Sequence, residues 1–253
     1  PVVQTHYGPT NGEPAIAGPG AAPQVFALTD KYLAPLQKHP EPPPSTTVEP
    51  EQQGERRLVV ERADAQSPIV AYAFHSGLGA GSKEFPTLEL LTTILSQGES
   101  SRLHQRLVEK EPAATQAGAF AEAGFDPGLL WIYAMLPPGG DMAKAESLLD
   151  DELAKIARDG VTAAELDKAR NLKASAFWRG MATINGKARA LGTYEVFNGD
   201  YRKLFDAPTA YEAVSAADVQ ALATKILRVQ NRTTGLLKPV AAAPTADKKE
   251  AAK

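Results

Sequence analysis

The chain has 253 residues, of which 43% are hydrophobic and 23% charged, and its formal net charge is −3 with an isoelectric point of about 5.9. Such a slightly acidic chain lacks the basic surface that a nucleic-acid backbone requires, so we expect no nucleic-acid binding. Because it contains no cysteine, disulfides, thiolate metal sites and cysteine nucleophiles are excluded.

The first fifty residues are rich in proline and predict little regular structure. Eleven of the twenty prolines lie there, and residues 1–22 show no usable periodicity, which predicts disorder. One short amphipathic helix is expected over about 23–36, followed by a stiff, polar, proline-rich linker. An isolated helix followed by a linker is interpreted as the end of a preceding domain.

Two strands and two helices are expected to open the folded body. Apolar and alternating side chains predict strands at about 57–61 and 68–75. An amphipathic helix then ends before Gly98, and Ser100 or Ser101 is expected to cap the next helix.

The middle of the chain predicts a hairpin and then a helix. Apolar runs at 114–123 and 129–136 flank turn residues at Asp126–Gly128, which favours antiparallel pairing. Apolar side chains at spacings of three and four predict a helix over 141–159, which stops at Gly160.

A capping box of Thr162 and Glu165 opens a long helical stretch, which we expect glycines 180 and 186 to interrupt. Ser215 and Asp218 open the last helix, and a strand at 232–237 ends the fold. This order of elements predicts an α+β two-layer sandwich, with helices packed on one face of a mixed or mostly antiparallel sheet.

These elements divide the chain into four expected segments. They are a disordered remnant (1–22), a terminal helix of a preceding domain plus linker (23–54), the folded domain (55–240) and a disordered tail (241–253).

No residue pattern supports a catalytic or metal site in this chain. A helical zinc site needs two histidines three or four positions apart, and the closest two of the four histidines (His6, His39, His75 and His104) are far more widely spaced. The serines after Gly98 do not form a nucleophile elbow, because position 102 is arginine. We therefore expect neither a catalytic residue nor a metal ligand.

Other conspicuous residues have structural interpretations. The glycine-rich segment Gly77–Gly81 lies between a strand and a helix but lacks the third glycine of a dinucleotide site, so a flexible loop is favoured over nucleotide binding. The acidic residues 150–152 and Asp167 are expected on solvated helix faces. Trp131 and Trp178 are expected in the core or facing a partner.

Several segments resemble, in order and spacing, the pitrilysin, insulinase and mitochondrial-processing-peptidase superfamily of zinc proteases. They are the run 88–97 with the turn Gly98-Glu-Ser-Ser-Arg-Leu103, the segment 160–171, the segment 187–195, the segment 214–219 and the closing segment 231–239. The similarity covers about 55–239, and the short helix before the linker resembles the end of the family's preceding domain.

The resemblance implies one of two paired α+β domains, the first of which carries an inverted zinc motif. In the accessory type of second domain, an arginine and a tyrosine seven positions apart hold the substrate peptide. The matching positions here are Val108 and Thr115, so no substrate-binding residue is carried over. The family-motif residues are implied to be structural, and they are Gly98, Ser100, Ser101, Arg102 and Leu103.

The function implied is that of the C-terminal, structural and partner-binding half of a zinc metalloendopeptidase subunit, inactive alone. Zinc is expected in a missing N-terminal domain or a partner subunit, and peptide substrate is expected only in the assembled enzyme. The alternative is a stand-alone interaction subunit that assembles with a separate zinc-bearing chain. Because a half-molecule exposes apolar surface, homo-oligomers are expected.

The compartment implied by the resemblance is the periplasm or the cell exterior. No signal peptide is recognisable, so an export signal would lie outside this sequence. No run reaches the roughly 18 to 20 apolar residues of a membrane span, which predicts none.

Overall fold

A computed structural model describes residues 6–8, 11–38 and 49–240. The predicted tail at 241–253 and most of the predicted linker lie outside the described residues. No helix of the described ranges is long and apolar enough to cross a bilayer.

The chain divides into two compact units, which we describe separately. The sheet unit contains residues 51–173 and 209–240 of the described chain. The helical unit contains residues 174–208 together with the described residues up to Pro50.

The sheet unit is built on a five-stranded sheet with the strand order β1-β5-β2-β4-β3. In chain order the strands are β1 (Arg56–Arg62), β2 (Ile69–His75), β3 (Gln116–Ala121), β4 (Leu129–Met135) and β5 (Arg232–Pro239). β1 runs parallel to β5, and every other neighbouring pair is antiparallel. The predicted strands and the mixed, mostly antiparallel sheet are thus confirmed.

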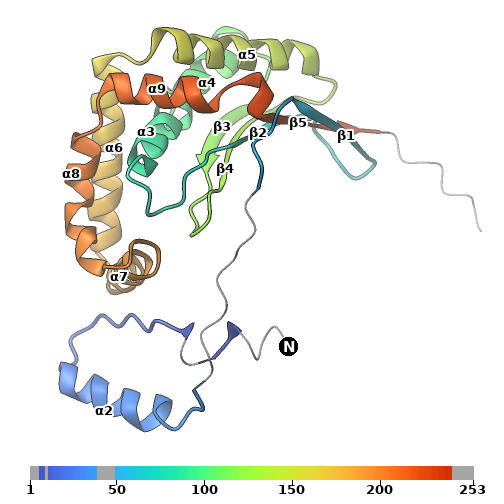
Figure 1. The fold of residues 1–253 in the computed structure, drawn as a ribbon. Helices are drawn as coiled ribbons and strands as arrows, with labels where there is room; N and C mark the ends of the chain where they lie inside the picture. Colours follow the sequence, from blue (N-terminus) through green and yellow to red (C-terminus); the bar gives the residue numbers. More distant parts are fainter. Residues whose placement is uncertain (1–5, 9–10, 39–48, 241–253) are drawn as a thin grey trace, which may run out of the picture. The chain divides into compact units, whose positions relative to one another are not determined.

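The helices of the sheet unit cover one face of this sheet (Figure 1). They include α3 (Phe85–Ser96), α5 (Met142–Asp159), the first part of α6 (Ala163–Met181), the end of α8 (Ala207–Glu212) and α9 (Ala216–Ile226). A short helix α4 (Arg102–His104) continues into the π-helical η2 (Gln105–Lys110), and a 3-10 turn η4 (Val229–Asn231) precedes β5.

Strand alternation explains which side chains form the core. Successive residues of a strand point to opposite faces, so Val70, Tyr72 and Phe74 of β2 share one face and are at most 1% exposed. Leu130 and Ile132 of β4 lie on the same face and are fully buried. They pack with apolar side chains of α3, α5 and α9 in one core. The predicted α+β two-layer architecture is confirmed.

The predicted capping box at Thr162 is present, and Ser215 and Asp218, which were expected to open the last helix, form a second one. The Thr162 hydroxyl accepts from the N–H of Glu165, whose carboxylate accepts from the N–H of Thr162. Ser215 and Asp218 form the same pair of hydrogen bonds at the start of α9. Ser101 does occupy the position before α4, but its side chain makes no capping hydrogen bond, so that part of the prediction is wrong.

The helical unit contains α2 (Ala22–Leu33), the end of α6, α7 (Ile184–Asn198) and the 3-10 turn η3 (Tyr201–Asp206), which runs into α8. The helix expected over 23–36 corresponds to α2. The long helical stretch does break, but between its two glycines, where Thr183 accepts from the N–H of Gly186 and caps α7. Gly186 is needed there because a Cβ at this position would collide with the carbonyl of Gly180.

Candidate functional site

The family-motif turn leads from α3 into α4. Gly98 has φ of +79°, a conformation that favours glycine, and its carbonyl accepts from the N–H of Ser101 at 3.0 Å. Leu103 is fully buried in the core. Ser100 is exposed and accepts a hydrogen bond from Lys168 of α6, which ties the turn to that helix. The Ser101 hydroxyl is buried and has no hydrogen-bond partner among the described residues.

Arg102 is the residue of this turn with the most extensive contacts. Its Nε donates to Glu165 at 2.7 Å and its Nη2 donates to the same carboxylate at 3.0 Å. The Nη2 atom also donates to the carbonyl of Gly160 at 3.0 Å. Its Nη1 lies 3.6 Å from the carboxylate of Glu152, with no direct hydrogen bond. The Arg102 side chain of α4 therefore contacts α5 through Glu152, the turn after α5 through Gly160, and the start of α6 through Glu165.

These contacts stabilise the charged forms of the partners. The hydrogen bonds from Arg102 outweigh the opposing effect of burial and, with those from Thr162, lower the pKa of Glu165 to about 2. Burial alone would lower the pKa of Arg102, but its hydrogen bonds and ion pairs with Glu165 and Glu152 raise it above the usual value. The pair is therefore charged throughout the physiological pH range.

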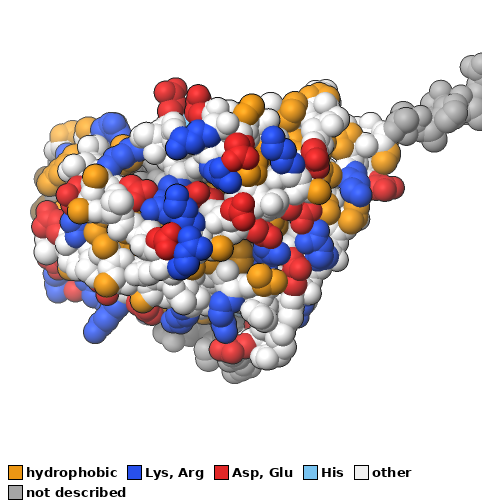
Figure 2. Space-filling view, turned by 90° about the horizontal axis from the view of Figure 1, so that it is seen from above, with side chains coloured by type: hydrophobic (Ala, Val, Ile, Leu, Met, Phe, Trp, Pro, Cys, Tyr) orange, Lys and Arg blue, Asp and Glu red, His pale blue; other side chains and the backbone are white. Residues whose placement is uncertain are grey.

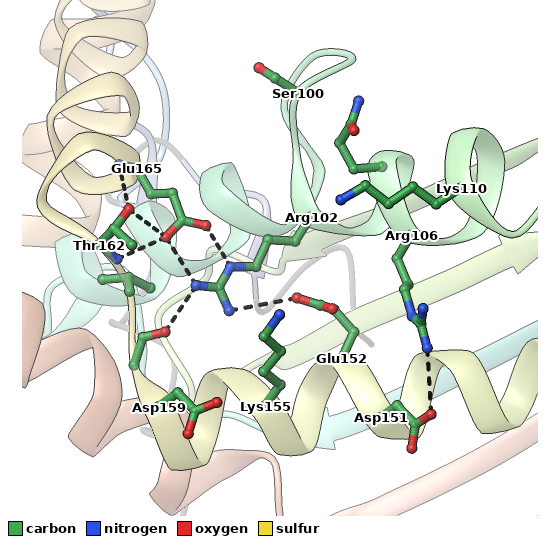
Figure 3. Close-up of a pocket in the computed structure, with 13 residues that line it drawn as sticks. Ser100, Arg102, Arg106, Lys110, Asp151, Glu152, Lys155, Asp159, Thr162 and Glu165 are labelled. Atoms are coloured by element: carbon green, nitrogen blue, oxygen red, sulfur yellow. Dashed lines mark hydrogen bonds and ion pairs between the residues drawn. The ribbon is translucent and has the colours of Figure 1, made fainter.

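A cleft of about 680 Å³ opens beside Arg102, between α4 and η2 on one side and α5 and the start of α6 on the other (Figure 3). Its charged side chains include four cations and four carboxylates: Arg102, Arg106, Lys110, Lys155, Asp151, Glu152, Asp159 and Glu165. Figure 3 shows Lys110 and Lys155 pointing into the cleft, and neither forms an ion pair within the described chain. With equal numbers of charges of each sign, the cleft is electrostatically balanced.

One expectation about these acids is wrong. Glu152 was expected on a solvated helix face but is 7% exposed, because it faces inward from α5 beside Arg102. Asp151 is solvated as expected and reaches Arg106 at 3.7 Å. Asp150 pairs with Arg232 and is about half exposed. Each carboxylate of the cleft thus has a cationic neighbour, so these side chains form an ion-pair network.

The helix face of the sheet unit carries the same mixture of charges. Figure 2 shows this face, formed by α5 and α9, with Lys and Arg side chains interspersed among Asp and Glu. A mixed surface of this kind has no extended field of one sign to attract a highly charged partner.

The described residues do not fit a zinc site. His75 ends β2, while the His104 ring contacts Glu109 at 3.1 Å, and His6 belongs to the helical unit. No group of three histidine, aspartate or glutamate side chains within the described ranges could hold a metal ion. His39 lies outside those ranges.

The glycine-rich loop has a packing role. Ala80 donates to the carbonyl of Gly124 at 2.9 Å, and a Cβ at Gly79 would come 2.5 Å from the carbonyl oxygen of Phe125. The loop therefore lies directly against the β3–β4 turn, and Gly79 permits this close approach. The positions matched to the family's substrate-holding pair are a half-buried Val108 on η2 and an exposed Thr115, whose hydroxyl donates to the carbonyl of Met135.

The second face of the sheet is uncovered and apolar. No helix or strand of the sheet unit, as described, packs over it (Figure 1). Leu58 and Val60 of β1 point to it and are 48% and 41% exposed. Trp131 of β4 stacks on Phe120 of β3 with ring centroids 6.3 Å apart, and the neighbouring Tyr133 covers Gly118. We call this surface the open face.

Sequence patterns alone did not indicate two features of this region. The first is the burial of Glu152, which directly follows two solvated acids in the chain. The 3.6-residue period of a helix places Glu152 on the same face as the buried Leu149 and Ile156, and this spacing is the signal that could have revealed it. The π-helical η2 lies in a segment with neither glycine nor proline, so no residue there marked a departure from an ordinary α-helix. Both tryptophans are outside the core: Trp131 is half-buried on the open face and Trp178 is 65% exposed.

Comparison with known proteins places the chain in a family. The model of the Peptidase M16 inactive domain matches residues 2–173. The zinc protease PqqE of Helicobacter pylori is 26% identical over 239 residues, covering 92% of this chain and 53% of that protein. This chain thus spans about half the length of that curated relative.

Solved structures share its fold. A protease from Helicobacter pylori has a TM-score of 0.81 at 25% identity, covering 88% of this chain and 54% of that one. An inactive peptidase domain from Bordetella parapertussis has a TM-score of 0.62 at 32% identity, covering 70% of this chain and 95% of that one. The periplasmic protease PqqL of Escherichia coli has a TM-score of 0.71 at 14% identity, which shows a common fold alone. Because the family model covers well over half of the sequence, this chain belongs to the Peptidase M16 inactive domain family, which is related to bacterial zinc proteases.

Proposed function

We propose that this chain is the non-catalytic half of a zinc endopeptidase and closes the proteolytic chamber by binding the zinc-bearing half. The observation that carries the proposal is the open face, an apolar sheet surface on a domain whose other face is already covered. An exposed apolar surface of this kind is typical of a contact with another domain or subunit. The chain's match to half the length of a zinc protease agrees with this role.

In this proposal the zinc ion and the catalytic groups belong to the partner half, and peptide substrate is cleaved only in the assembled enzyme. The ion-pair network around Arg102 then serves to hold the helices in place behind the open face. The segment up to residue 54 is proposed to be the end of a preceding domain and its linker. A periplasmic location is proposed from the family resemblance.

The first test compares the chain alone with the assembled enzyme. We expect the purified chain to contain no stoichiometric zinc by elemental analysis and to leave a quenched fluorescent peptide uncleaved. Addition of the zinc-bearing half should give cleavage that a chelator stops. Zinc near one ion per chain, together with chelator-sensitive cleavage by the chain alone, would contradict the proposal.

Substitutions on β1 test the open face. Val60→Glu places a charge on that face and is expected to weaken assembly with the zinc-bearing half by at least about tenfold, because the charge would be buried without a partner. Val59→Glu is a matched control, since Val59 is 52% exposed on the same strand but points to the opposite face. Equal assembly of both variants would argue against the open face as the interface.

The alternative is a stand-alone interaction subunit that assembles with a separately encoded zinc-bearing chain. The extent of the reading frame separates the two. A frame that extends upstream into a domain with the inverted zinc motif favours the first arrangement, and a frame that starts near Pro1 favours the second.

A further inference from the structure

The edge strand β1 is held to the sheet on one side and buries little apolar surface. It ends the strand order, and β5 is the only strand of the described chain that pairs with it. All seven of its residues are exposed, and its three apolar side chains, Leu58, Val59 and Val60, are 41% to 52% exposed. Burial of apolar area therefore contributes little to holding β1 in place, which leaves more of that role to its polar contacts.

A polar cluster at the start of β1 joins the entering chain to β5. Arg232, the first residue of β5, has a side chain that is 7% exposed and lies over the ring of Tyr72, with its guanidinium carbon 4.3 Å from the ring centroid. Its Nε and Nη2 atoms donate to one carboxylate oxygen of Glu55, at 3.0 and 2.8 Å, and its Nη1 atom donates to Asp150. The hydroxyl of Thr234 donates to the same oxygen of Glu55 at 2.8 Å. Glu55, the residue before β1, is therefore held by two residues of β5.

The burial of Arg232 makes this contact firm. Glu55 is the acceptor for both Nε and Nη2, so its removal would leave two buried donors of a charged group without that partner. Buried donors that lose their acceptor are strongly destabilising, more so when the group is charged. The cluster therefore favours the arrangement in which the entering chain lies against β5.

Gln52 extends the contact with β5 further toward the N-terminus. Its side-chain Nε2 donates to the carbonyl of Arg232 at 2.7 Å, and its side-chain oxygen accepts from the hydroxyl of Thr233 at 3.4 Å. The adjacent Gln53 donates to the carbonyl of Glu51 at 3.3 Å and makes no hydrogen bond to β5 in the described chain. Two neighbouring glutamines thus differ in that the first contacts β5 and the second does not.

We propose that Gln52, Glu55 and Arg232 form an entry clamp, which holds β1 on β5 and thereby positions the part of the open face that β1 carries. Leu58 and Val60 are the open-face residues of β1, so each separation of β1 from β5 displaces both side chains. The residues of the entry clamp are positioning residues, because they act on the open face through β1. This inference rests on the proposed function, since it makes the entry clamp a condition for tight assembly with the zinc-bearing half.

Hydrogen exchange of the chain alone tests whether β1 is held in this way. The N–H of Val240 donates to the carbonyl of Arg62 at 3.1 Å, so the even-numbered residues of β1 direct their backbone groups toward β5. The amides of Leu58 and Val60 are therefore protected while β1 is paired, and their exchange rates report how often β1 separates.

Three substitutions separate the entry clamp from other effects on these two amides. Gln52→Ala is expected to raise their exchange rates about tenfold, because separation of β1 no longer breaks the contacts of this side chain with β5. Gln53→Ala is the matched control at the adjacent position and should change the rates less than about twofold. Ile156→Val is the control for overall stability, since Ile156 is fully buried on α5. It should speed the exchange of amides in the middle of the sheet and leave the two β1 amides at their wild-type rates.

Assembly with the zinc-bearing half tests the positioning role. The double variant Gln52→Ala/Glu55→Ala removes the side-chain contacts of the entering chain with β5. It should raise the dissociation constant at least about fivefold, because binding must first restore β1 to the sheet. Gln53→Ala should leave the dissociation constant unchanged within about twofold. Circular dichroism checks that each variant is folded.

Wild-type exchange rates of the β1 amides in Gln52→Ala, or equal acceleration of them by Ile156→Val, would overturn the entry clamp. Unchanged assembly of the double variant, in an experiment where Val60→Glu does weaken assembly, would overturn its positioning role. If Val60→Glu also leaves assembly unchanged, the open face is not the interface and the proposed function fails. The exchange rates, measured on the chain alone, still decide in that case whether the entry clamp holds β1.

Discussion

At the scale of single residues, Arg102 connects three helices of the sheet unit: α4, α5 and α6. Its side chain is 14% exposed, and the neighbouring Glu152 side chain is 9% exposed. A buried charge pair adds little net stability relative to apolar side chains, but the loss of one partner leaves the other charge without compensation. The contribution of Arg102 to the free energy of unfolding is therefore best measured by replacing it alone and together with Glu152.

Arg102→Met is expected to lower the free energy of unfolding by about 3 kcal/mol, because Glu152 stays buried without its cation. Urea denaturation of the purified chain measures this loss. The double variant Arg102→Met/Glu152→Gln should recover part of it, since the orphaned charge is then absent.

The control for this experiment is Arg158→Met. Arg158 also pairs with a carboxylate, that of Asp159 at 2.8 Å, but its side chain is 70% exposed. Its removal is expected to change stability by less than about 1 kcal/mol. Equal losses for the two arginine variants would show that burial of the Arg102 network has no special importance.

The Arg102–Glu165 pair also predicts a pH dependence. The folded-state pKa of Glu165 is about 2, below its ordinary value of 4.5. A group with a lowered folded-state pKa stabilises the fold above its unfolded pKa, and this contribution is lost as the pH falls. The stability difference between wild type and Glu165→Gln should therefore be constant above pH 4.5 and shrink between pH 4.5 and 2. Urea denaturation across that range measures it, and a difference that does not vary with pH would contradict the assignment.

At the scale of elements, the turn from α5 to α6 depends on Gly160. Its φ of 73° and ψ of −152° are accessible to glycine and almost to no other residue. A Cβ there would also lie 3.2 Å from the side-chain amide of Gln220 on α9. Since the Gly160 carbonyl is a partner of Arg102, the turn positions both helices and the ion-pair network.

Gly160→Ala is accordingly expected to lower the free energy of unfolding by about 1–3 kcal/mol. Gly180→Ala is the control, because that glycine lies within α6, has open space around its Cα and should be neutral or slightly stabilising as alanine. Thermal unfolding followed by circular dichroism compares the two. An unchanged melting temperature for Gly160→Ala would mean that the turn adapts without strain.

Elements with a local signature could be predicted from the sequence. The capping boxes at Thr162 and Ser215, the stop at Gly160 and the hairpin all depend on residues close in the chain. The features that were missed depend on distant partners. Ser101 turns inward because Leu103 anchors the turn in the core, and Glu152 is buried because Arg102, fifty positions away, meets it. The proposed function rests on the family resemblance, because hydrophobic periodicity alone indicates no function.

At the scale of the whole molecule, the open face predicts self-association of the isolated chain. Leu58 and Val60 extend an apolar surface that continues over Trp131 and Phe120. Contact between two such surfaces would remove apolar area from water without any specific pairing of charges. The isolated chain is therefore expected to form dimers or larger species.

Sedimentation velocity at several protein concentrations measures this association. Leu58→Glu should raise the dissociation constant of the dimer about tenfold relative to wild type, because dimerisation would bury the new charge. Val59→Glu on the opposite face of β1 should leave the equilibrium unchanged within about twofold. Strictly monomeric wild-type protein at high concentration would contradict the expectation.

The strand order has a consequence for the synthesis of the protein. β5, the last of the described strands in chain order, lies between β1 and β2, the first two. While a ribosome is still making the chain, β1 therefore has no neighbour to pair with, and β2 can pair only with β4. β1 therefore stays unpaired until β5 has been synthesised, and termination of translation before Arg232 would leave an exposed strand prone to aggregation.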